Sequence, residues 1–206
     1  MKQIRNTIQR DIVLQTVQEL VGHHPTAEDI YLAVIQKKPR ISRGTVYRNL
    51  NILCDLGMII RNVIKRNQDS LLYQKINIEI EQINYTVLSD TKWLEFIINQ
   101  IVSNSIKYHC QNNCKIIFKV IKTNNIALEI IDNGIGIKKS DLSKVFNKSF
   151  TGENGRLVSS STGMGLYIVK RLCDKLGHKI IVESQYNKYT KVTLYFNDDQ
   201  YYNVVR

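Results

Sequence analysis

The chain has 206 residues, with 29 Lys and Arg against 18 Asp and Glu, so its formal net charge is +11 at neutral pH. That length accommodates one domain or two small ones. A composition that is 43% hydrophobic and 23% charged predicts a packed core. No apolar run approaches the roughly 20 residues that a membrane helix needs, and no signal-peptide segment is recognisable. We therefore expect neither a membrane protein, nor a secreted disulfide scaffold, nor a fibre.

The positive charge is concentrated in the first third of the chain. Residues 1–75 hold 12 basic and 6 acidic side chains, net +6, whereas residues 76–206 hold 17 and 12, net +5. A concentrated positive field favours a polyanionic partner such as nucleic acid. Biased codon usage would explain the same Lys-, Ile- and Asn-rich composition, so charge alone leaves both readings open. Four cysteines without an export signal predict reduced thiols and a cytoplasmic location.

Apolar residues recur at helical spacing in three segments before residue 58. The first covers about residues 7–20, the second follows an N-cap at Thr26, and the third follows an N-cap at Ser42. We expect the third to run to about residue 56, with Gly57 as the residue that ends it. Its outward face would carry polar types that read base edges and phosphates, among them Thr45 and Tyr47. A solvated polar helix face is the alternative.

Residues 5–60 include "HPTAEDIYLAV" and "PRISRGTVYRNLNILCDLGMI", and they resemble the N-terminal winged-helix domain of ferric-uptake-regulator repressors. The resemblance implies that Tyr47 and Arg48 face the major groove and that Arg5 and Arg10 lie near the DNA backbone or minor groove. The residues that we expect to contact DNA are Arg5, Arg10, Ser42, Thr45, Tyr47 and Arg48.

Metal sensing by that family needs ligands that we do not find. His24 matches a position that ligates the regulatory metal in some members, but no His-x-His cluster or CxxC pair follows. Cys110 and Cys114 have the wrong spacing for a zinc knuckle. We interpret His24 as a loop histidine and do not expect metal sensing.

The junction with the next unit is ambiguous. Residues 61–74 form either a weak wing hairpin or the tail of a helix that belongs to the following domain, and a strand pattern begins at Ile76. We expect a winged-helix domain over residues 1–72 and a second domain over residues 76–206.

A helix predicted over residues 93–108 carries three functional groups along one face. Gln100, Asn104 and Lys107 stand at i, i+4 and i+7, so they project in nearly the same direction. The amide oxygen of Asn104 can ligate Mg²⁺, and Lys107 can neutralise a phosphate. An ordinary amphipathic helix is the alternative.

Two glycine-containing turns follow paired strand patterns. Asp132, at a strand end, can accept a hydrogen bond from adenine N6, and Gly134 and Gly136 allow a sharp turn close to a flat base. Gly163 and Gly165 precede a helix, whose N-terminus favours phosphate. Between the two turns, residues 146–162 are suited to a mobile lid that contains Lys148 and Arg156; a plain loop is the alternative.

The order of these segments over about residues 76–197 is similar to the ATP-binding catalytic domain of sensor histidine kinases. "NQIVSNSIKY" matches the family's N box, although Gln100 stands where Asn is more usual. The resemblance implies a mixed sheet under three helices, an α+β fold overall, and Tyr108 against the nucleotide. The residues that we expect to bind ATP and Mg are Asn104 (also the metal ligand), Lys107, Tyr108, Asp132, Gly134, Gly136, Lys148, Arg156, Thr162, Gly163, Gly165 and Leu166.

A phosphoacceptor histidine is not recognisable, since none of His23, His24, His109 and His178 precedes a carboxylate. We therefore expect no catalytic residue in cis, and phosphoryl transfer only to a histidine of another chain. The expected partners are DNA, an acceptor histidine domain or a response regulator. A transcription regulator whose ATP domain only binds ligand is the first alternative; a winged helix that only packs on a kinase fragment is the second. Because the dimerisation elements of both families are missing, the pairing suggests a fusion, either engineered or from joined gene fragments.

Overall fold

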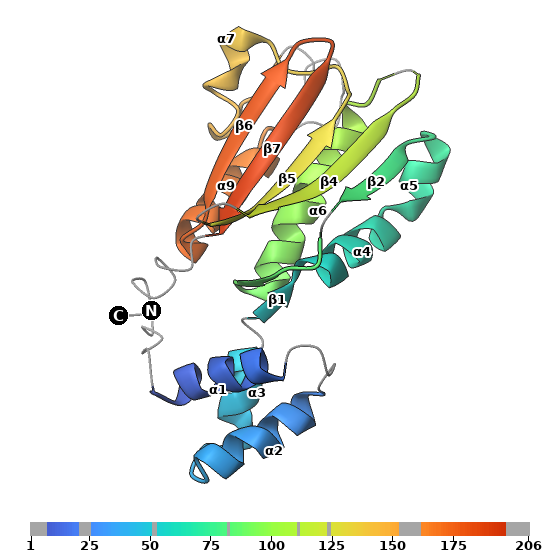
Figure 1. Cartoon of the computed structure of the whole chain (residues 1–206). Coiled ribbons are helices and arrows are strands. Elements are labelled where there is room, and N and C mark those ends of the chain that lie inside the picture. The colour runs from blue at the N-terminus through green and yellow to red at the C-terminus, as the bar shows by residue number, and fades with distance from the viewer. Residues whose placement is uncertain are drawn as a thin grey trace.

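The computed structural model describes residues 8–20, 26–50, 53–81, 83–110, 112–122, 125–152 and 162–196. Figure 1 shows three N-terminal helices beside a larger unit built on a sheet. None of the helices in the described ranges combines the length and the apolarity needed to cross a membrane. The elements in chain order are α1 (Ile8–Glu19), α2 (Ala27–Lys37), α3 (Arg43–Leu50), β1 (Leu53–Asp55), α4 (Leu56–Arg66), α5 (Gln68–Tyr73), β2 (Asn77–Glu81), β3 (Thr86–Leu88), α6 (Thr91–Lys107), β4 (Lys115–Lys122), β5 (Ile126–Asp132), α7 (Lys139–Leu142), α9 (Gly165–Leu176), β6 (Lys179–Gln185) and β7 (Tyr189–Phe196).

The caps predicted for the N-terminal helices are present. At the start of α2, the backbone N–H of Asp29 donates to Thr26 Oγ1 at 3.2 Å, and the backbone N–H of Thr26 donates to Asp29 Oδ2 at 2.8 Å. The two bonds form a capping box, which satisfies amide groups that the helix leaves without partners. At the start of α3, the N–H of Thr45 donates to Ser42 Oγ at 3.2 Å. Helices α1 to α3 surround a small core of Val13, Ile30, Val34, Ile41 and Val46.

The third helix ends earlier than its sequence predicts. It stops at Leu50, and β1 then pairs antiparallel with β3. The Asp55 side chain caps the next helix, α4, by accepting from the N–H of Met58 at 2.9 Å. Gly57 therefore lies in the first turn of α4 and does not end α3, which corrects the expectation. Between the two interpretations of residues 61–74, the structure shows helix, in α4 and α5, rather than a hairpin.

Helix α4 packs with the sheet unit. Its buried Ile59, Ile60 and Val63 belong to the core that also contains Phe118 of β4, and the core of α1 to α3 shares no residue with it. Helix α4 belongs to this core because its apolar stripe lies against α6. The two cores thus divide between residues 50 and 54, whereas the sequence predicts the change of domain at residues 72–76. We propose that residues 53–73 are part of the second unit.

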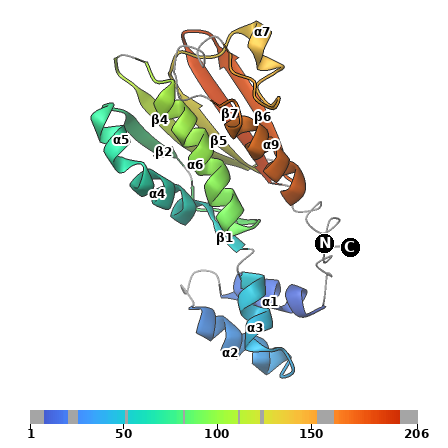
Figure 2. The ribbon, with the colours of Figure 1, turned by 180° about the vertical axis from the view of Figure 1, so that it is seen from behind.

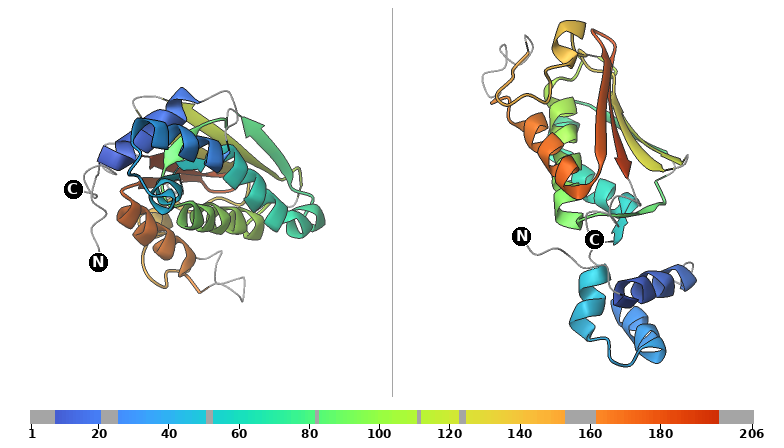
Figure 3. Two further views of the ribbon diagram at one scale, coloured as in Figure 1. Left: turned by 90° about the horizontal axis from the view of Figure 1, so that it is seen from below. Right: turned by 90° about the vertical axis from the view of Figure 1, so that its left-hand side faces the viewer.

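Five strands form a mixed sheet in the order β2-β4-β5-β7-β6. Strand β2 runs parallel to β4, and the other neighbours are antiparallel. Figures 2 and 3 show α4, α6 and α9 together on one face of this sheet. The expected α+β fold, with a mixed sheet under three helices, is confirmed.

Alternation along β4 explains which face the helices cover. Ile116, Phe118 and Val120 point to the helices and are at most 1% exposed. Burying each such side chain stabilises the fold by about 1.5–3 kcal/mol. The opposite face carries ion pairs, among them Lys191 with Glu183 at 2.6 Å and with Glu129 at 3.6 Å.

Candidate functional site

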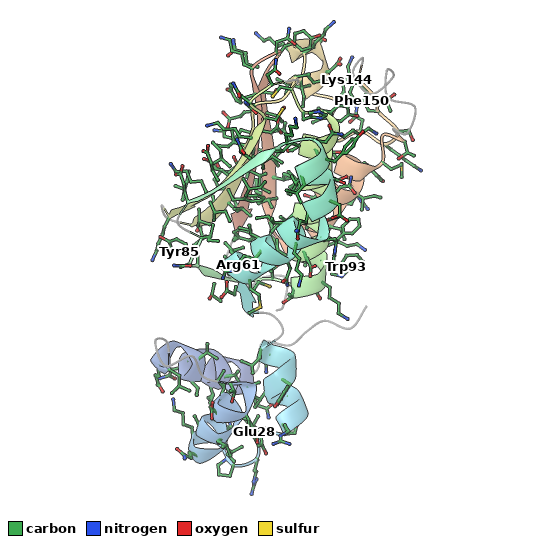
Figure 4. All side chains as sticks on the ribbon, turned by 90° about the vertical axis from the view of Figure 1, so that its right-hand side faces the viewer. Glu28, Arg61, Tyr85, Trp93, Lys144 and Phe150 are labelled. Atoms are coloured by element: carbon green, nitrogen blue, oxygen red, sulfur yellow. The ribbon has the colours of Figure 1, made fainter. Side chains whose placement is uncertain are left out.

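A cavity of about 400 Å³ lies between α6, the segment after β5 and the beginning of α9. Figure 4 labels Phe150, one of its lining residues, at the end of the molecule far from Trp93 at the start of α6. The cavity is therefore associated with the C-terminal end of α6. Its polar lining residues are Gln100, Ser103, Asn104, Ser105, Lys107, Tyr108, Lys138, Asp132, Asp141, Thr151, Thr162 and Thr190.

Asp132, the last residue of β5, is the buried carboxylate of this lining. It is 7% exposed. Its Oδ2 accepts from Ser105 Oγ at 2.7 Å, and its Oδ1 accepts from the N–H of Gly134 at 3.0 Å. Burial raises the pKa of Asp132 above its ordinary value, and the hydrogen bonds from Ser105, Gly134 and Thr190 oppose that rise. The carboxylate is held at a fixed position by neutral donors, and no cation is among the groups that shift its pKa.

Two lining glycines adopt backbone conformations that side chains disfavour. Gly136 has φ +66° and Gly163 has φ +65°. A Cβ on Gly136 would lie 2.2 Å from the carbonyl oxygen of Gln185, and a Cβ on Gly163 would lie 2.6 Å from that of Phe150. These clashes involve backbone atoms, which cannot move aside easily. The local geometry thus requires glycine at both turns.

Gly134 supports the cavity from behind and is not in its lining. Besides donating to Asp132, it passes close to the end of α6, where a Cβ would lie 2.3 Å from the carbonyl oxygen of Tyr108. The same oxygen accepts from the N–H of Ile135 at 3.0 Å. The turn after β5 is therefore fastened to the C-cap of α6.

The three predicted side chains of α6 lie together on the cavity. Gln100, Asn104 and Lys107 all belong to the lining, as their spacing predicts. Lys107 Nζ lies 5.7 Å from the centre of the Tyr108 ring. Gln100 also packs against the start of α9, where a Cβ on Gly165 would lie 2.5 Å from its Nε2. The amide at position 100 thus occupies space beside α9.

The N-terminal end of α9 borders the cavity on its other side. Gly163, just before the helix, and Gly165 and Leu166, in its first turn, line the cavity. The first N–H groups of a helix have no partner within the helix, and its dipole favours an anion there. This end of the cavity can therefore hold phosphate oxygens. The cation Lys107 and the amide Asn104 lie in the same lining.

Most of the predicted nucleotide-binding residues are brought together. The cavity is lined by Asn104, Lys107, Tyr108, Asp132, Gly136, Thr162, Gly163, Gly165 and Leu166. Lys148 is exposed and is not among the lining residues, so its contact with a nucleotide stays a prediction. Arg156 lies outside the described residues.

Ser105 and Thr190 contact Asp132, and neither was predicted. Ser105 follows Asn104 directly, one step round α6, so it faces β5 from the same turn. Thr190 is the partner of Asp132 in the register of β5 and β7. A hydroxyl one residue after Asn104 is a signal that could have been noticed. The register of two strands that are 58 residues apart in the chain is not readable from a local pattern.

The side chains predicted to bind DNA are described only in part. Ser42 is exposed, and Tyr47 is 39% exposed and donates from its hydroxyl to Glu28 Oε2 at 3.3 Å. Thr45 is half-buried. Arg5, the side chains of Arg10 and Arg48, and His24 lie outside the described residues.

Arg43, which the sequence interpretation did not include, is exposed on α3. It forms an ion pair with Glu28 of α2 and lies 5.1 Å from the centre of the Tyr31 ring. Glu28 raises the pKa of the Arg43 guanidinium above its ordinary value through their hydrogen bond. Glu28 therefore binds two polar side chains of α3.

Comparisons with known proteins match the two parts of the chain to two different families. The family described as Histidine kinase-, DNA gyrase B-, and HSP90-like ATPase matches residues 89–200, and the Ferric uptake regulator family matches residues 1–79. Both resemblances noted from the sequence are thus confirmed. The second match covers α1 to α3 and continues through α4 and α5.

Curated relatives are sensor kinases. The sensor histidine kinase YxdK of Bacillus subtilis is 37% identical over 126 residues, which are 61% of this chain and 38% of the relative. The sensor protein kinase GraS of Staphylococcus aureus is 41% identical over 110 residues, which are 53% of this chain and 32% of the relative. The chain thus spans less than half the length of these relatives.

Solved structures share the fold. The catalytic domain of the histidine kinase ThkA is 21% identical, with a TM-score of 0.60, and the match covers 70% of this chain and 95% of that one. The Acinetobacter baumannii histidine kinase AdeS is 20% identical, with a TM-score of 0.55, over 92% of this chain and 95% of that one. Because the model of the ATPase family matches more than half of the residues, the chain belongs to the histidine kinase-, DNA gyrase B- and HSP90-like ATPase family.

Proposed function

We propose that the chain binds Mg·ATP in the cavity and acts as the catalytic module of a two-component sensor histidine kinase. The observation that carries the proposal is the convergence of Asp132 and Asn104, from two distant segments, on one cavity that also receives the start of α9. This lining suits a purine triphosphate. It has a carboxylate at one part, and an amide, an ammonium and a helix N-terminus at another.

Asp132 binds the adenine end in this proposal. Its two carboxylate oxygens accept from Ser105 and Gly134 and keep further acceptor capacity, since an ionised carboxylate has about four lone-pair sites. One of these accepts from the exocyclic amine of adenine. Gly136 lets the backbone come close to the flat base. Guanine carries a carbonyl oxygen in place of that amine, so the carboxylate would repel it.

The phosphate end is bound by α6 and α9. Mg²⁺ prefers oxygen ligands and is commonly held by one or two side chains together with phosphate oxygens and waters. The amide oxygen of Asn104 fits that donor set, and within the described residues no cluster of three His, Cys, Asp or Glu offers another kind of metal site. When bound, the ion neutralises phosphate charge. Lys107 and the first N–H groups of α9 orient the phosphates.

The acceptor histidine comes from another chain in this proposal. His178 is 4% exposed and packs at 5.1 Å, edge to face, against Phe196. The Nδ1 atom of His109 lies 2.8 Å from the carbonyl oxygen of Ile106. His178 is therefore sequestered in the core, and His109 is engaged with the end of α6. A response regulator would receive the phosphoryl group from the separate acceptor.

Radiolabelled ATP tests the transfer directly. The full chain is incubated with Mg·ATP and a separately supplied helical hairpin that carries a phosphoacceptor histidine. We expect label on the hairpin, and none when the chain is replaced by its Asn104→Ala variant or when the acceptor histidine is replaced by Gln. Label that never reaches the hairpin, although ATP is bound, would contradict transfer and favour a domain that only binds ligand.

DNA binding through α3 is a second candidate function. It is supported by the exposed Ser42 and Tyr47 and by the match of residues 1–79 to the Ferric uptake regulator family. We expect operator-type DNA to bind more tightly than random DNA, and Tyr47→Ala to weaken that preference. If both DNAs bind equally and Tyr47→Ala changes nothing, the three helices serve only to pack. If ATP changes DNA affinity without any phosphoryl transfer, the chain is a ligand-dependent regulator.

A further inference from the structure

Two cysteine sulfurs lie next to each other behind the cavity. Cys110 Sγ and Cys114 Sγ are 2.9 Å apart, the first just after α6 and the second just before β4. A disulfide requires an S–S distance of about 2.05 Å, so the sulfurs need to approach by less than about 1 Å. Both cysteines are free thiols. A short movement of Cys110 toward Cys114 would therefore bring the two sulfurs to bonding distance.

The other two cysteines of the chain are placed differently. Cys54 and Cys173 are 1% and 0% exposed, whereas Cys110 is partly exposed. Burial raises the pKa of Cys54 to about 11 and that of Cys173 to about 12. Thiolates, not thiols, are the reactive form. Cys54 and Cys173 are thus internal controls for any reagent that reaches Cys110.

The thiol pair is connected to the turn that follows Asp132. Cys110 Sγ lies 3.7 Å from Asn133 Oδ1, and Asn133 also accepts from the N–H of Lys115 at 2.7 Å. Cys110 is two residues beyond Tyr108, whose carbonyl oxygen is bonded to Ile135. Movement of Cys110 is therefore transmitted to a lining residue of the cavity and to the turn beside it.

Cys114 is the fixed member of the pair. It is 3% exposed, its carbonyl oxygen accepts from the N–H of Asn77 at 2.8 Å, and its thiol donates to the carbonyl oxygen of Cys110 at 2.6 Å. Burial raises the pKa of the Cys114 thiol to about 11. Cys110 is therefore the cysteine that an external reagent meets first.

We propose that Cys110 and Cys114 form a reversible oxidation site, at which a low-molecular-weight disulfide converts the pair to an intramolecular disulfide. The Cys110 thiol loses its proton, its sulfur attacks one sulfur of the reagent, and one reagent thiol leaves. The sulfur of Cys114, losing its own proton, then attacks the Cys110 sulfur of the mixed disulfide, and the second reagent thiol leaves. The two cysteines lose two electrons and two protons, and the reagent gains them.

Closure of this disulfide weakens nucleotide binding, a consequence that rests on the proposed function. Both thiol hydrogens are lost, including the one donated to the carbonyl oxygen of Cys110. Because Cys114 is anchored to β2, the approach draws Cys110 and the adjoining end of α6 toward it. The carbonyl of Tyr108, which accepts from the N–H of Ile135 and lies close to Gly134, is then displaced together with the turn beside the cavity. We expect about tenfold weaker binding of Mg·ATP.

Peptide mapping tests the oxidation site itself. The full chain is reduced, freed of reductant, treated with oxidised glutathione, alkylated and digested with trypsin. Cleavage after Lys107 and Lys115 releases one peptide that contains both Cys110 and Cys114. We expect this peptide to be unalkylated and lighter than the reduced peptide by two hydrogens, while Cys54 and Cys173 are alkylated. A peptide that stays alkylated at both cysteines, or that only retains glutathione, would overturn the proposal.

Calorimetric titration with Mg·ATP tests the consequence in the same samples. We expect the tenfold loss in the oxidised chain, recovery with dithiothreitol, and no response to oxidant in the C110S/C114S double variant. A closed disulfide that leaves the affinity unchanged would overturn the link to the cavity. If the reduced chain binds no nucleotide, the proposed function fails, whereas the peptide map still decides whether the oxidation site exists.

Discussion

Asp132 is the residue on which adenine recognition depends in this account. It is 7% exposed, and its hydrogen-bond donors are the hydroxyl of Ser105 and the backbone N–H groups of Gly134 and Thr190. Neutral donors hold the carboxylate in place without compensating its charge. Burial therefore raises its pKa. Because the adenine amine donates to this carboxylate in the proposed complex, nucleotide binding depends on whether Asp132 is protonated.

We predict that the affinity for Mg·ATP falls as the pH is lowered below neutral, because burial raises the pKa of Asp132 above that of an ordinary carboxyl group. Protonation of Asp132 removes the charge that strengthens its bond with the adenine amine. A raised pKa means that the folded chain takes up this proton more readily than the unfolded chain, so the loss of affinity is not unfolding caused by Asp132. Titrations of the parent and of Asp132→Asn separate this effect from titration of the phosphates, which both proteins share. Parallel pH profiles would contradict the role of Asp132.

Glu28 is a residue of the N-terminal helices whose charge we expect to affect DNA binding. It pairs with Arg43 and accepts from Tyr47, so it neutralises part of the face of α3. We predict that Glu28→Gln strengthens DNA binding about threefold to tenfold at low salt and steepens its salt dependence, because Arg43 becomes available to a phosphate. Glu19→Gln is the matched control, since it removes the same charge from an ion pair with Lys37 instead. Equal effects of the two variants would mean that only net charge matters.

At the scale of elements, the entry to α9 is one of the two constrained glycine turns of the cavity. Gly163 has positive φ, and Gly165 leaves room for Gln100. The helix then starts at the cavity and ends at Gly177, which adopts the left-handed conformation at φ 74°. The position of the α9 N-terminus, and with it the proposed phosphate site, is therefore set by backbone geometry.

We predict that Gly163→Ala lowers the free energy of unfolding by about 1–3 kcal/mol and weakens Mg·ATP binding. The added Cβ meets the carbonyl group of Phe150 in a conformation that alanine disfavours. Gly44→Ala is the control, because nothing lies within 4 Å of its Cβ position in α3, and it should leave stability unchanged or raise it by up to about 1 kcal/mol. Chemical denaturation and calorimetry measure both. Equal stability of the two variants would show that the turn is not strained.

The sequence predicts the elements of this fold better than it predicts their partners. Local signals place the caps at Thr26 and Ser42 and the line of Gln100, Asn104 and Lys107 on α6. Helix α4 has an equally clear apolar stripe, but a stripe does not say which core it joins, so residues 61–74 stayed open. Ser105 and Thr190 were not predicted as site residues for the same reason, because their contacts with Asp132 come from packing and strand register.

At the scale of the whole molecule, the buried residues that the structure describes form two hydrophobic cores with no residue in common. One is small and lies among α1 to α3, and the other lies between the sheet and the helices that cover it. Units with separate cores can unfold separately. The cavity belongs to the larger unit alone, so a nucleotide should stabilise only that unit.

We predict that Ile60→Ala and Ile41→Ala destabilise different unfolding transitions, each by about 2–5 kcal/mol. Ile60 of α4 is 0% exposed in the larger core, and Ile41 is 2% exposed in the smaller one. In scanning calorimetry, Ile60→Ala should lower the transition that Mg·ATP raises, and Ile41→Ala should lower the other. If Ile60→Ala shifts the same transition as Ile41→Ala, α4 belongs with the N-terminal helices.

Calorimetric titration of the reduced full chain with Mg·ATP tests the central claim most directly. We expect one nucleotide per chain, with the affinity reduced about tenfold or more in both Asn104→Ala and Asp132→Asn, because each removes a different contact with the same ligand. The claim is that these two side chains hold one magnesium-complexed nucleotide. It would be contradicted if no binding heat were measured at all of several temperatures, or if the variants bound as tightly as the parent.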